Sequence, residues 1–204
     1  MTKYSNFEKI PQDQYFTPLK AVEPLAKFLP PNATFYEPCA GDGRLVQHVE
    51  NLGMGITCAG YSDLDPVSAR QTADDHFNGA AKTDVNQLDA LALTREDLNG
   101  AQMIITNPPW TRTKASGYIL HKMIEHFSNL APTWLLFDAS WANTSQAVPY
   151  MNRCTDIAAI GRVKWFPNTN QSGKKDACWY RFTHPDLRTR PAPLFHGRGM
   201  GMSG

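Results

Sequence analysis

The sequence lacks any long apolar run. Its 204 residues contain no stretch of the roughly 18 consecutive apolar residues that a membrane-spanning helix needs. The first residues, Met1 to Asn6, are polar and do not open the apolar segment of a signal peptide. We therefore expect a cytoplasmic protein that has no membrane partner.

Cysteine is scarce and scattered. The four cysteines, Cys39, Cys58, Cys154 and Cys178, show none of the close spacing that zinc sites use. Small disulfide-stabilised domains carry a far denser set of cysteines. We expect reduced thiols, no disulfide framework and no metal site.

Charge is modest but unevenly distributed. Charged residues make up 19% of the chain, apolar residues 42%, and the net charge is +1, as in a globular protein large enough for one domain. Residues 151–204, however, carry nine Lys and Arg against three Asp and Glu, whereas residues 1–150 carry 11 against 16. The basic C-terminal quarter can attract phosphates. An ordinary solvated surface explains the same excess equally well.

Apolar runs and helical periodicity alternate along the chain, which is typical of an α/β fold. We predict helices at residues 19–29, 44–52, 66–77 and 118–130, and strands at residues 33–37, 56–62, 79–85, 101–106, 133–138, 156–166 and 177–182. Because the last two strands follow one another through a polar loop, we expect them to pair antiparallel. The prediction is an N-terminal arm (1–14), one catalytic domain (15–183) and a basic tail rich in Pro and Gly (184–204).

A glycine-containing turn follows the first predicted strand. Glu37 ends the strand, Gly41 and Gly43 follow, and a helix begins directly after them. Glycines let the backbone approach a ligand that a Cβ would exclude. The third glycine of the dinucleotide fingerprint is missing, and a carboxylate at this position suits an ammonium group better than a pyrophosphate. A purely structural turn is the alternative.

An acidic residue ends the second predicted strand. Asp63 lies about 20 residues after the glycines, where nucleotide-binding α/β folds hold a ribose diol. Asp65 precedes Pro66 and fits the N-cap of the following helix. We assign Asp63 to the ribose and Asp65 to the cap.

The strand predicted at residues 101–106 ends in Asn107-Pro108-Pro109-Trp110. Both prolines lack an N–H and have a restricted φ, so the loop is stiff. The Asn107 amide oxygen and the Pro108 carbonyl can accept hydrogen bonds from one amino group while Trp110 stacks on a base. A plain loop that stops a strand is the alternative.

Together, the segment Glu37-Pro38-Cys39-Ala40-Gly41-Asp42-Gly43 and the Asn-Pro-Pro-Trp motif resemble the amino-group methyltransferases that use S-adenosylmethionine (SAM). The resemblance is to the N6-adenine DNA type, in a small form similar to those of phages and mobile elements. It implies a Rossmann-like fold with a mostly parallel seven-stranded sheet and one antiparallel strand. It also implies methyl transfer from SAM to N6 of adenine in DNA after base flipping.

Other activities remain open. The same motif can present N4 of cytosine, an adenine in RNA or a glutamine amide of a protein. A non-catalytic subunit that binds SAM or a nucleotide is an alternative of another class. We expect no separate recognition domain after Phe182, so the base sequence would be read by loops, by a second subunit, as in a homodimer, or hardly at all.

The resemblance also assigns residues to the two ligands. A Tyr/Phe-x-Thr-Pro segment contacts the methionine end of the cofactor, and an acidic residue after the third strand meets its adenine. The implied cofactor residues are Tyr15, Phe16, Thr17, Pro18, Glu37, Pro38, Ala40, Gly41, Gly43, Asp63, Leu64, Asp84, Val85 and Asn107. Tyr15 to Pro18 can instead be only a helix cap with aromatic packing.

On the substrate side, Asn107, Pro108, Pro109 and Trp110 form the implied catalytic motif. Phe166 is the implied partner of Trp110 on the second face of the base, and Trp165 is the alternative. Four cations are expected to contact the substrate backbone: Arg112, Lys114, Lys174 and Lys175. A Trp at the last position of the motif departs from the more usual Tyr or Phe.

Overall fold

The computed structural model describes residues 14–110, 112–113, 117–167, 172–187 and 194–196. The α-helices are α1 (Leu19–Val22), α2 (Arg44–Glu50), α3 (Pro66–His76) and α4 (Ile119–Leu130). The short 3₁₀ helices are η2 (Glu23–Lys27), η3 (Ala90–Ala92), η4 (Ala139–Asn143), η5 (Val148–Tyr150) and η6 (Pro185–Leu187). The strands are β1 (Thr34–Glu37), β2 (Thr57–Asp63), β3 (Asn86–Gln87), β4 (Met103–Thr106), β5 (Arg112–Thr113), β6 (Gly117–Tyr118), β7 (Thr133–Asp138), β8 (Cys154–Arg162), β9 (Asp176–Phe182) and β10 (Leu194–His196).

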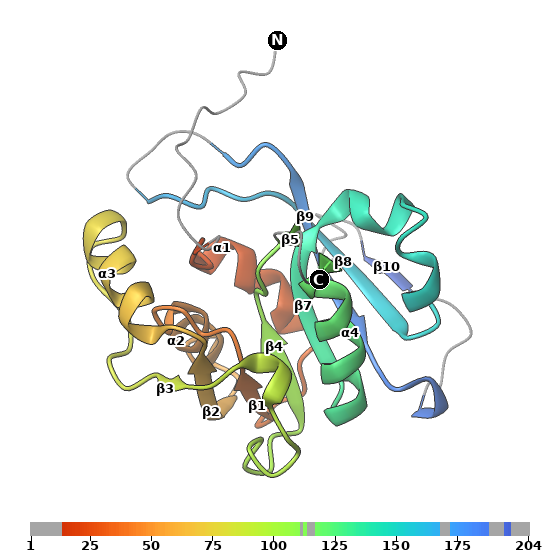
Figure 1. Cartoon of the computed structure of the whole chain (residues 1–204), viewed down its shortest axis with the longest axis horizontal. Helices are drawn as coiled ribbons and strands as arrows, with labels where there is room; N and C mark the ends of the chain where they lie inside the picture. Colours follow the sequence, from red (N-terminus) through yellow and green to blue (C-terminus); the bar gives the residue numbers. More distant parts are fainter. Residues whose placement is uncertain (1–13, 111, 114–116, 168–171, 188–193, 197–204) are drawn as a thin grey trace.

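One large sheet organises the fold, with the strand order β10-β8-β9-β7-β4-β1-β2-β3 (Figure 1). Strand β9 runs antiparallel to both β7 and β8, and the remaining strand pairs in this sheet are parallel. The seven strands from β8 to β3 confirm the predicted mostly parallel sheet with one antiparallel strand. Strand β10, from the predicted tail, adds an eighth strand beside β8.

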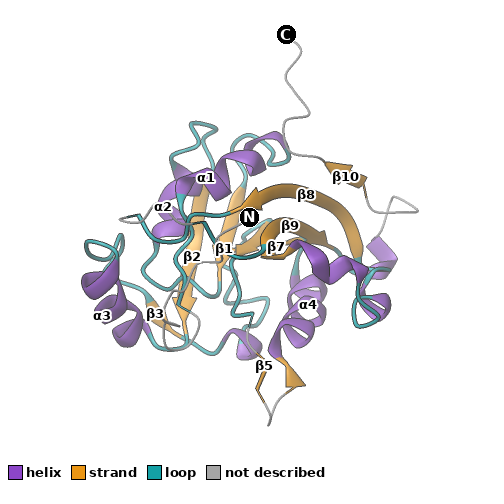
Figure 2. Ribbon diagram, turned by 90° about the horizontal axis from the view of Figure 1, so that it is seen from above, coloured by secondary structure: helices purple, strands orange, loops and turns teal. Residues whose placement is uncertain are grey.

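Helices cover both faces of this sheet (Figure 2). Consecutive strand residues point to opposite faces, so each buried strand supplies two cores. Phe35, Ile105 and Leu136 pack with α1, η2 and α2, whereas their neighbours Ile104 and Leu135 pack with α4. This alternation explains why the short strands read as continuous apolar runs.

Helix α4 confirms the amphipathic pattern predicted at residues 118–130. Leu120, Met123, Ile124 and Phe127 are buried at the i, i+3, i+4 and i+7 spacing of one helical face. Within the part of the chain that the structure describes, no helix is both long enough and apolar enough to cross a bilayer.

The helix predicted at residues 19–29 is interrupted. Helix α1 ends at Val22 and continues as the 3₁₀ helix η2, which contains Pro24. Proline cannot donate the helical hydrogen bond and its ring crowds the preceding turn, which explains the change. Pro18 occupies the N-cap position without a side-chain cap, and Thr17 is instead buried.

The third strand predicted at residues 79–85 is wrong, because β3 forms only at Asn86–Gln87. The amides of Ala81 and Lys82 both donate to the Asp42 carbonyl, at 3.0 and 2.9 Å. These N–H groups are therefore committed to the glycine turn and cannot pair with β2. The shift moves the carboxyl end of this strand along the chain, from Asp84 towards Asp89.

Candidate cofactor and substrate site

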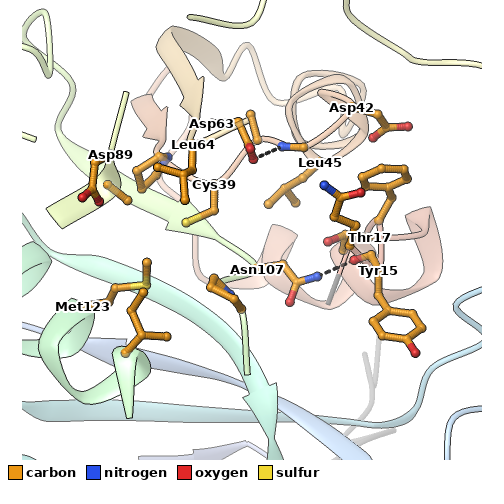
Figure 3. A pocket seen from close by; sticks show the side chains of 18 residues that line it. Tyr15, Thr17, Cys39, Asp42, Leu45, Asp63, Leu64, Asp89, Asn107 and Met123 are labelled. Atoms are coloured by element: carbon orange, nitrogen blue, oxygen red, sulfur yellow. Dashed lines mark hydrogen bonds between the residues drawn. The ribbon is translucent and has the colours of Figure 1, made fainter. Parts of the chain in front are cut away.

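A cavity of about 370 Å³ lies where the parallel strands β1, β2, β3 and β4 reach their carboxyl ends (Figure 3). This edge is where open α/β sheets bind ligands. Many residues predicted from the sequence line it: Tyr15, Phe16, Thr17, Pro38, Ala40, Gly41, Asp63, Leu64, Asn107 and Pro109. The structure thus brings the glycine turn and the Asn-Pro-Pro-Trp motif to a single pocket.

Other lining residues were not predicted. They are Gln14, Cys39, Asp42, Leu45, Asp89, Ala90, Ile119 and Met123. Cys39 and Asp42 lie inside the predicted turn, so the motif itself was a signal for them. Ile119 and Met123 come from α4, where the apolar pattern predicted only core packing. No local signal separates a helix residue that faces a cavity from one that faces the core.

The glycine turn depends on glycine at two positions. Gly41 has φ +55° and a Cβ there would lie 2.8 Å from the Phe16 ring, while Gly43 has φ +75° and a Cβ would lie 2.4 Å from Lys82. Left-handed φ values and such contacts exclude other residues without rearrangement. The Gly41 N–H donates to Asp63 Oδ2 at 2.8 Å, which joins the turn to the end of β2.

Asp63 is oriented before any ligand binds. Its Oδ2 accepts from Gly41 and its Oδ1 accepts from the Asp65 N–H at 2.9 Å. A carboxylate has further lone pairs with which to accept from a ligand hydroxyl. Asp65 itself caps α3 by accepting from the Ser68 N–H at 2.9 Å, as the sequence predicted.

Asn107 has one possible amide orientation. Its side-chain Nδ2 lies 2.9 Å from the Tyr15 carbonyl oxygen (Figure 3). A carbonyl can only accept, so the NH₂ group must face Tyr15 and Oδ1 must face away from it. No residue in the described part of the chain hydrogen-bonds to this oxygen, which leaves Asn107 with an oriented acceptor at the pocket.

Solved structures with a similar fold include several described as methyltransferases. The chain aligns with a type I restriction-modification methyltransferase subunit from Streptococcus thermophilus at TM-score 0.58 and 12% identity, over 90% of this chain and 47% of that one. A protein described as a class I SAM-dependent methyltransferase from Listeria monocytogenes aligns at TM-score 0.56 and 11% identity, over 94% and 68%. A third, described as an RNA methyltransferase from Pyrococcus horikoshii, aligns at TM-score 0.55 and 15% identity, over 89% and 92%.

The chain has the Rossmann-like fold of the SAM-dependent methyltransferases. No protein-family model matches the sequence, and no curated protein matches it. The chain spans about half the length of the Streptococcus thermophilus subunit. The methyltransferase fold implied by the sequence motifs is therefore confirmed, and the roles of individual residues remain predictions.

Several predicted residues do not line the pocket of this methyltransferase fold. They are Pro18, Glu37, Gly43, Asp84, Val85, Pro108, Trp110 and Phe166. Glu37 is fully buried, and its Oε1 accepts from the Cys39 N–H at 3.1 Å. Burial raises the pKa of Glu37 to about 8, an effect that nearby Thr106 and the Cys39 amide offset only in part. Glu37 therefore supports the turn through Cys39 and does not line the pocket.

Asp84, predicted to meet the adenine of the cofactor, does not line the pocket. It is exposed and accepts a hydrogen bond from the Tyr61 hydroxyl at 2.6 Å, away from the pocket. Because β3 forms at residues 86–87, the acidic residue delivered to the pocket is Asp89. Asp89 Oδ1 accepts from the Leu91 N–H at 2.9 Å and so begins η3.

The aromatic pair around Trp110 also differs from the prediction. Trp110 Nε1 donates to the Leu136 carbonyl at 3.0 Å, and its ring meets Trp165 edge to face, with centroids 5.8 Å apart. Phe166 instead stacks on Phe77, with centroids 5.4 Å apart and planes at 18°. Strand β8 ends at Arg162, so strand alternation does not decide how residues 165 and 166 point.

The predicted cations are placed unequally. Lys174 and Lys175 are exposed at the start of β9, and Lys175 forms an ion pair with Asp138 at the end of β7. Arg112 lies in β5, but its side chain and Lys114 are outside the described part of the structure. Among the described residues, no group of His, Cys, Asp and Glu is arranged to hold a metal.

Proposed function

We propose that the protein transfers a methyl group from SAM to the N6 amino group of adenine in DNA, with the target base flipped out of the duplex. One observation carries this proposal: Asn107, whose Oδ1 accepts no hydrogen bond from the described residues, shares a pocket with the glycine turn and Asp63. A cofactor site and an acceptor for an amino group are thus within one cavity.

The pocket residues fit SAM. Asp63 offers an oriented carboxylate to the ribose diol, and Asp89 replaces Asp84 as the acceptor for the adenine amino group. The apolar side chains of Leu64, Ile119 and Met123 suit a flat base. Gly41 keeps the turn free of a Cβ where the methionine end would lie, beside Tyr15, Phe16 and Thr17.

In this proposal, bound SAM supplies an electrophilic methyl group, and the protein prepares the amine. The lone pair of an adenine N6 is delocalised into the ring, so the amine is a weak nucleophile. Asn107 Oδ1 and the Pro108 carbonyl accept hydrogen bonds from its two N–H groups and favour a pyramidal nitrogen. The Tyr15 carbonyl holds the Asn107 amide in the accepting orientation, so this side chain need not turn when the base arrives.

Trp110 and Trp165 form the base clamp that we propose. The hydrogen bond from Trp110 to the Leu136 carbonyl fixes its ring, so Trp110 offers a rigid stacking face. Trp165 lies against that ring at an interplanar angle of 84°, and in this proposal it moves aside to let a base stack on Trp110. Trp165, rather than Phe166, then covers the second face of the base.

DNA is the substrate we favour. The Streptococcus thermophilus structure belongs to a restriction-modification system, and Lys174 adds an exposed cation after the base clamp. RNA is the second candidate, because the Pyrococcus horikoshii structure is described as an RNA methyltransferase and is covered over 92% of its length. We further propose that the protein acts in the cytoplasm. If it recognises a specific base sequence in the DNA, we propose that it does so as a homodimer.

Labelled SAM tests the activity. We expect unmodified DNA to become labelled, and nucleoside digestion with mass spectrometry to identify N6-methyladenine. Asn107→Ala removes a hydrogen-bond acceptor for the reacting nitrogen, so the rate of DNA methylation by this variant should fall by roughly 10²–10³-fold. SAM binding, measured by calorimetry, should be largely kept.

The outcomes separate the candidates. Methylated adenine in RNA alone would transfer the proposal to RNA, and methylated cytosine would change the target base. Equal labelling of DNA by wild type and Asn107→Ala would remove Asn107 from the reaction. A protein that binds SAM but labels none of these substrates would be a non-catalytic subunit.

A further inference from the structure

Arg44 lies just behind the pocket, at the first position of α2. Its side chain is only 17% exposed, and its guanidinium makes three polar contacts. Nη2 lies 3.2 Å from the Phe77 carbonyl oxygen, 3.0 Å from the Gly79 carbonyl oxygen and 2.9 Å from Asp42 Oδ2. Arg44 therefore joins the glycine turn to the end of α3.

The same guanidinium lies beside two aromatic rings. Its Cζ is 5.9 Å from the centroid of Phe16 and 5.3 Å from that of Phe77, and the two rings are 4.8 Å apart. These distances are within the range of cation–π attraction. Phe16 lines the pocket and Phe77 is the C-cap residue of α3, where a cation is favoured by the helix dipole.

Asp42 depends on Arg44 for its charge balance. Asp42 is 1% exposed and lines the pocket. Its Oδ1 accepts a hydrogen bond from the backbone N–H of Arg44 at 3.0 Å. Burial raises the pKa of Asp42 to about 6, and Arg44 limits that rise. Lys82 donates its backbone N–H to the Asp42 backbone carbonyl, not to the carboxylate, and its ammonium lies 3.5 Å from Glu50 Oε2.

We propose that Arg44 is a positioning residue for the cofactor, which holds Phe16 and Asp42 in the places that shape the methionine end of the pocket. This inference rests on the proposed use of SAM. Arg44 does not itself line the pocket, so its effect passes through these two residues. Removing the guanidinium should allow Phe16 and Asp42 to shift and should weaken SAM binding. The groups proposed to act on the amine at Asn107 should stay in place.

The test compares arginine variants by calorimetry with SAM and by initial rates. A hydrogen bond to a charged group contributes roughly 1.5–3 kcal/mol, so Arg44→Gln should weaken SAM binding by about 10–100-fold. Arg44→Lys keeps the charge but not the planar fork, and should lie between wild type and Arg44→Gln. The kcat at saturating SAM should stay within about threefold of wild type, because the acceptors for the amine are untouched.

Arg70 provides the matched control. It is an exposed arginine on α3 that also donates to a backbone carbonyl, that of Thr83, but it does not line the pocket. Arg70→Gln should bind SAM as wild type does. Thermal unfolding shows whether each variant is folded. If Arg44→Gln does not fold, the SAM affinity of Arg44→Lys provides the test.

Two results would overturn the inference. One is wild-type SAM affinity in the folded Arg44→Lys and Arg44→Gln proteins. The other is a loss of kcat at saturating SAM as large as the loss of affinity, which would indicate general disruption. Failure of the wild-type protein to bind SAM would instead refute the proposed function, so the two failures can be told apart.

Discussion

At the scale of single residues, burial decides the protonation of Glu37. A carboxylate with no access to water loses its hydration, which favours the neutral acid. Only one of its oxygens accepts a well-formed hydrogen bond, from Cys39, and Oε2 has no partner in the described structure. With a pKa of about 8, Glu37 is mostly protonated at neutral pH.

This protonation makes the folding stability depend on pH. Between the ordinary pKa of 4.5 and about 8, the folded protein holds a proton at Glu37 that the unfolded chain has lost. The free energy of unfolding should therefore fall as pH rises through this window, in total by a few kcal/mol. Denaturant unfolding at pH 6, 7 and 8 measures the slope.

Glu37→Gln is the matched variant, because its amide stays neutral at every pH. It should match wild type near pH 5, be the more stable protein at pH 8, and show little slope between pH 6 and 8. Asp42, whose pKa is near 6, contributes a slope of the same sign mainly below that window. Parallel curves for both proteins between pH 6 and 8 would rule out Glu37 as the source.

Asp89 and Asp84 form a second comparison at this scale. Asp89 lines the pocket, whereas Asp84 is exposed and bonded to Tyr61. Asp89→Asn should weaken SAM binding by roughly tenfold, the effect of one lost hydrogen bond to a charged group. Asp84→Asn should leave it unchanged. Fluorescence or calorimetric titration with SAM measures both affinities. A larger loss in Asp84→Asn than in Asp89→Asn would support the assignment of Asp84 made from the sequence.

At the scale of elements, the segment between β8 and β9 carries the aromatic residues of both sides of the site. Trp165 contacts Trp110 and Tyr15, while Phe166 contacts Phe77 and Tyr15. Gly173 allows this arrangement, because a Cβ there would lie 2.8 Å from Trp165 Nε1. The two adjacent residues share Tyr15 and differ in their second neighbour, which is Trp110 of the substrate motif for Trp165 and Phe77 at the end of α3 for Phe166.

This division can be measured. Trp165→Ala should weaken binding of a DNA with a flipped-out target base by roughly 5–100-fold, the value of 1–3 kcal/mol for a stacked base. Its SAM affinity should stay near that of wild type. Phe166→Ala should have the smaller effect on DNA. A stronger loss of DNA binding in Phe166→Ala than in Trp165→Ala would support the sequence-based choice of Phe166.

At the scale of the whole molecule, strand order assembles the site. Strands β4 and β2 flank β1 in the sheet, so the segments that follow these three strands meet at one edge. Those segments carry Asn107, Asp63 and the glycine turn. Segment 14–17 then closes the pocket from outside the sheet, and Gln14 donates to Ser68 on α3 at 3.2 Å.

The sequence by itself determined those features that depend on neighbouring residues in the chain. Apolar runs determined most strands, the spacing of Ile119, Met123, Phe127 and Leu130 determined α4, and Gly41 and Gly43 marked a turn whose φ values only glycine accepts easily. The Asn-Pro-Pro-Trp motif pointed to a loop that supplies Asn107 and Pro109 to the pocket.

Only the tertiary structure decided which neighbours those residues meet. The amides of Ala81 and Lys82 bond to Asp42 across the chain, which moves β3 and brings Asp89, not Asp84, to the pocket. Burial by surrounding elements encloses Glu37, and a contact from outside the strand selects Trp165 over Phe166 beside Trp110. Hydrogen bonds and burial that involve distant segments leave no periodic pattern in the sequence, so only the three-dimensional structure shows them.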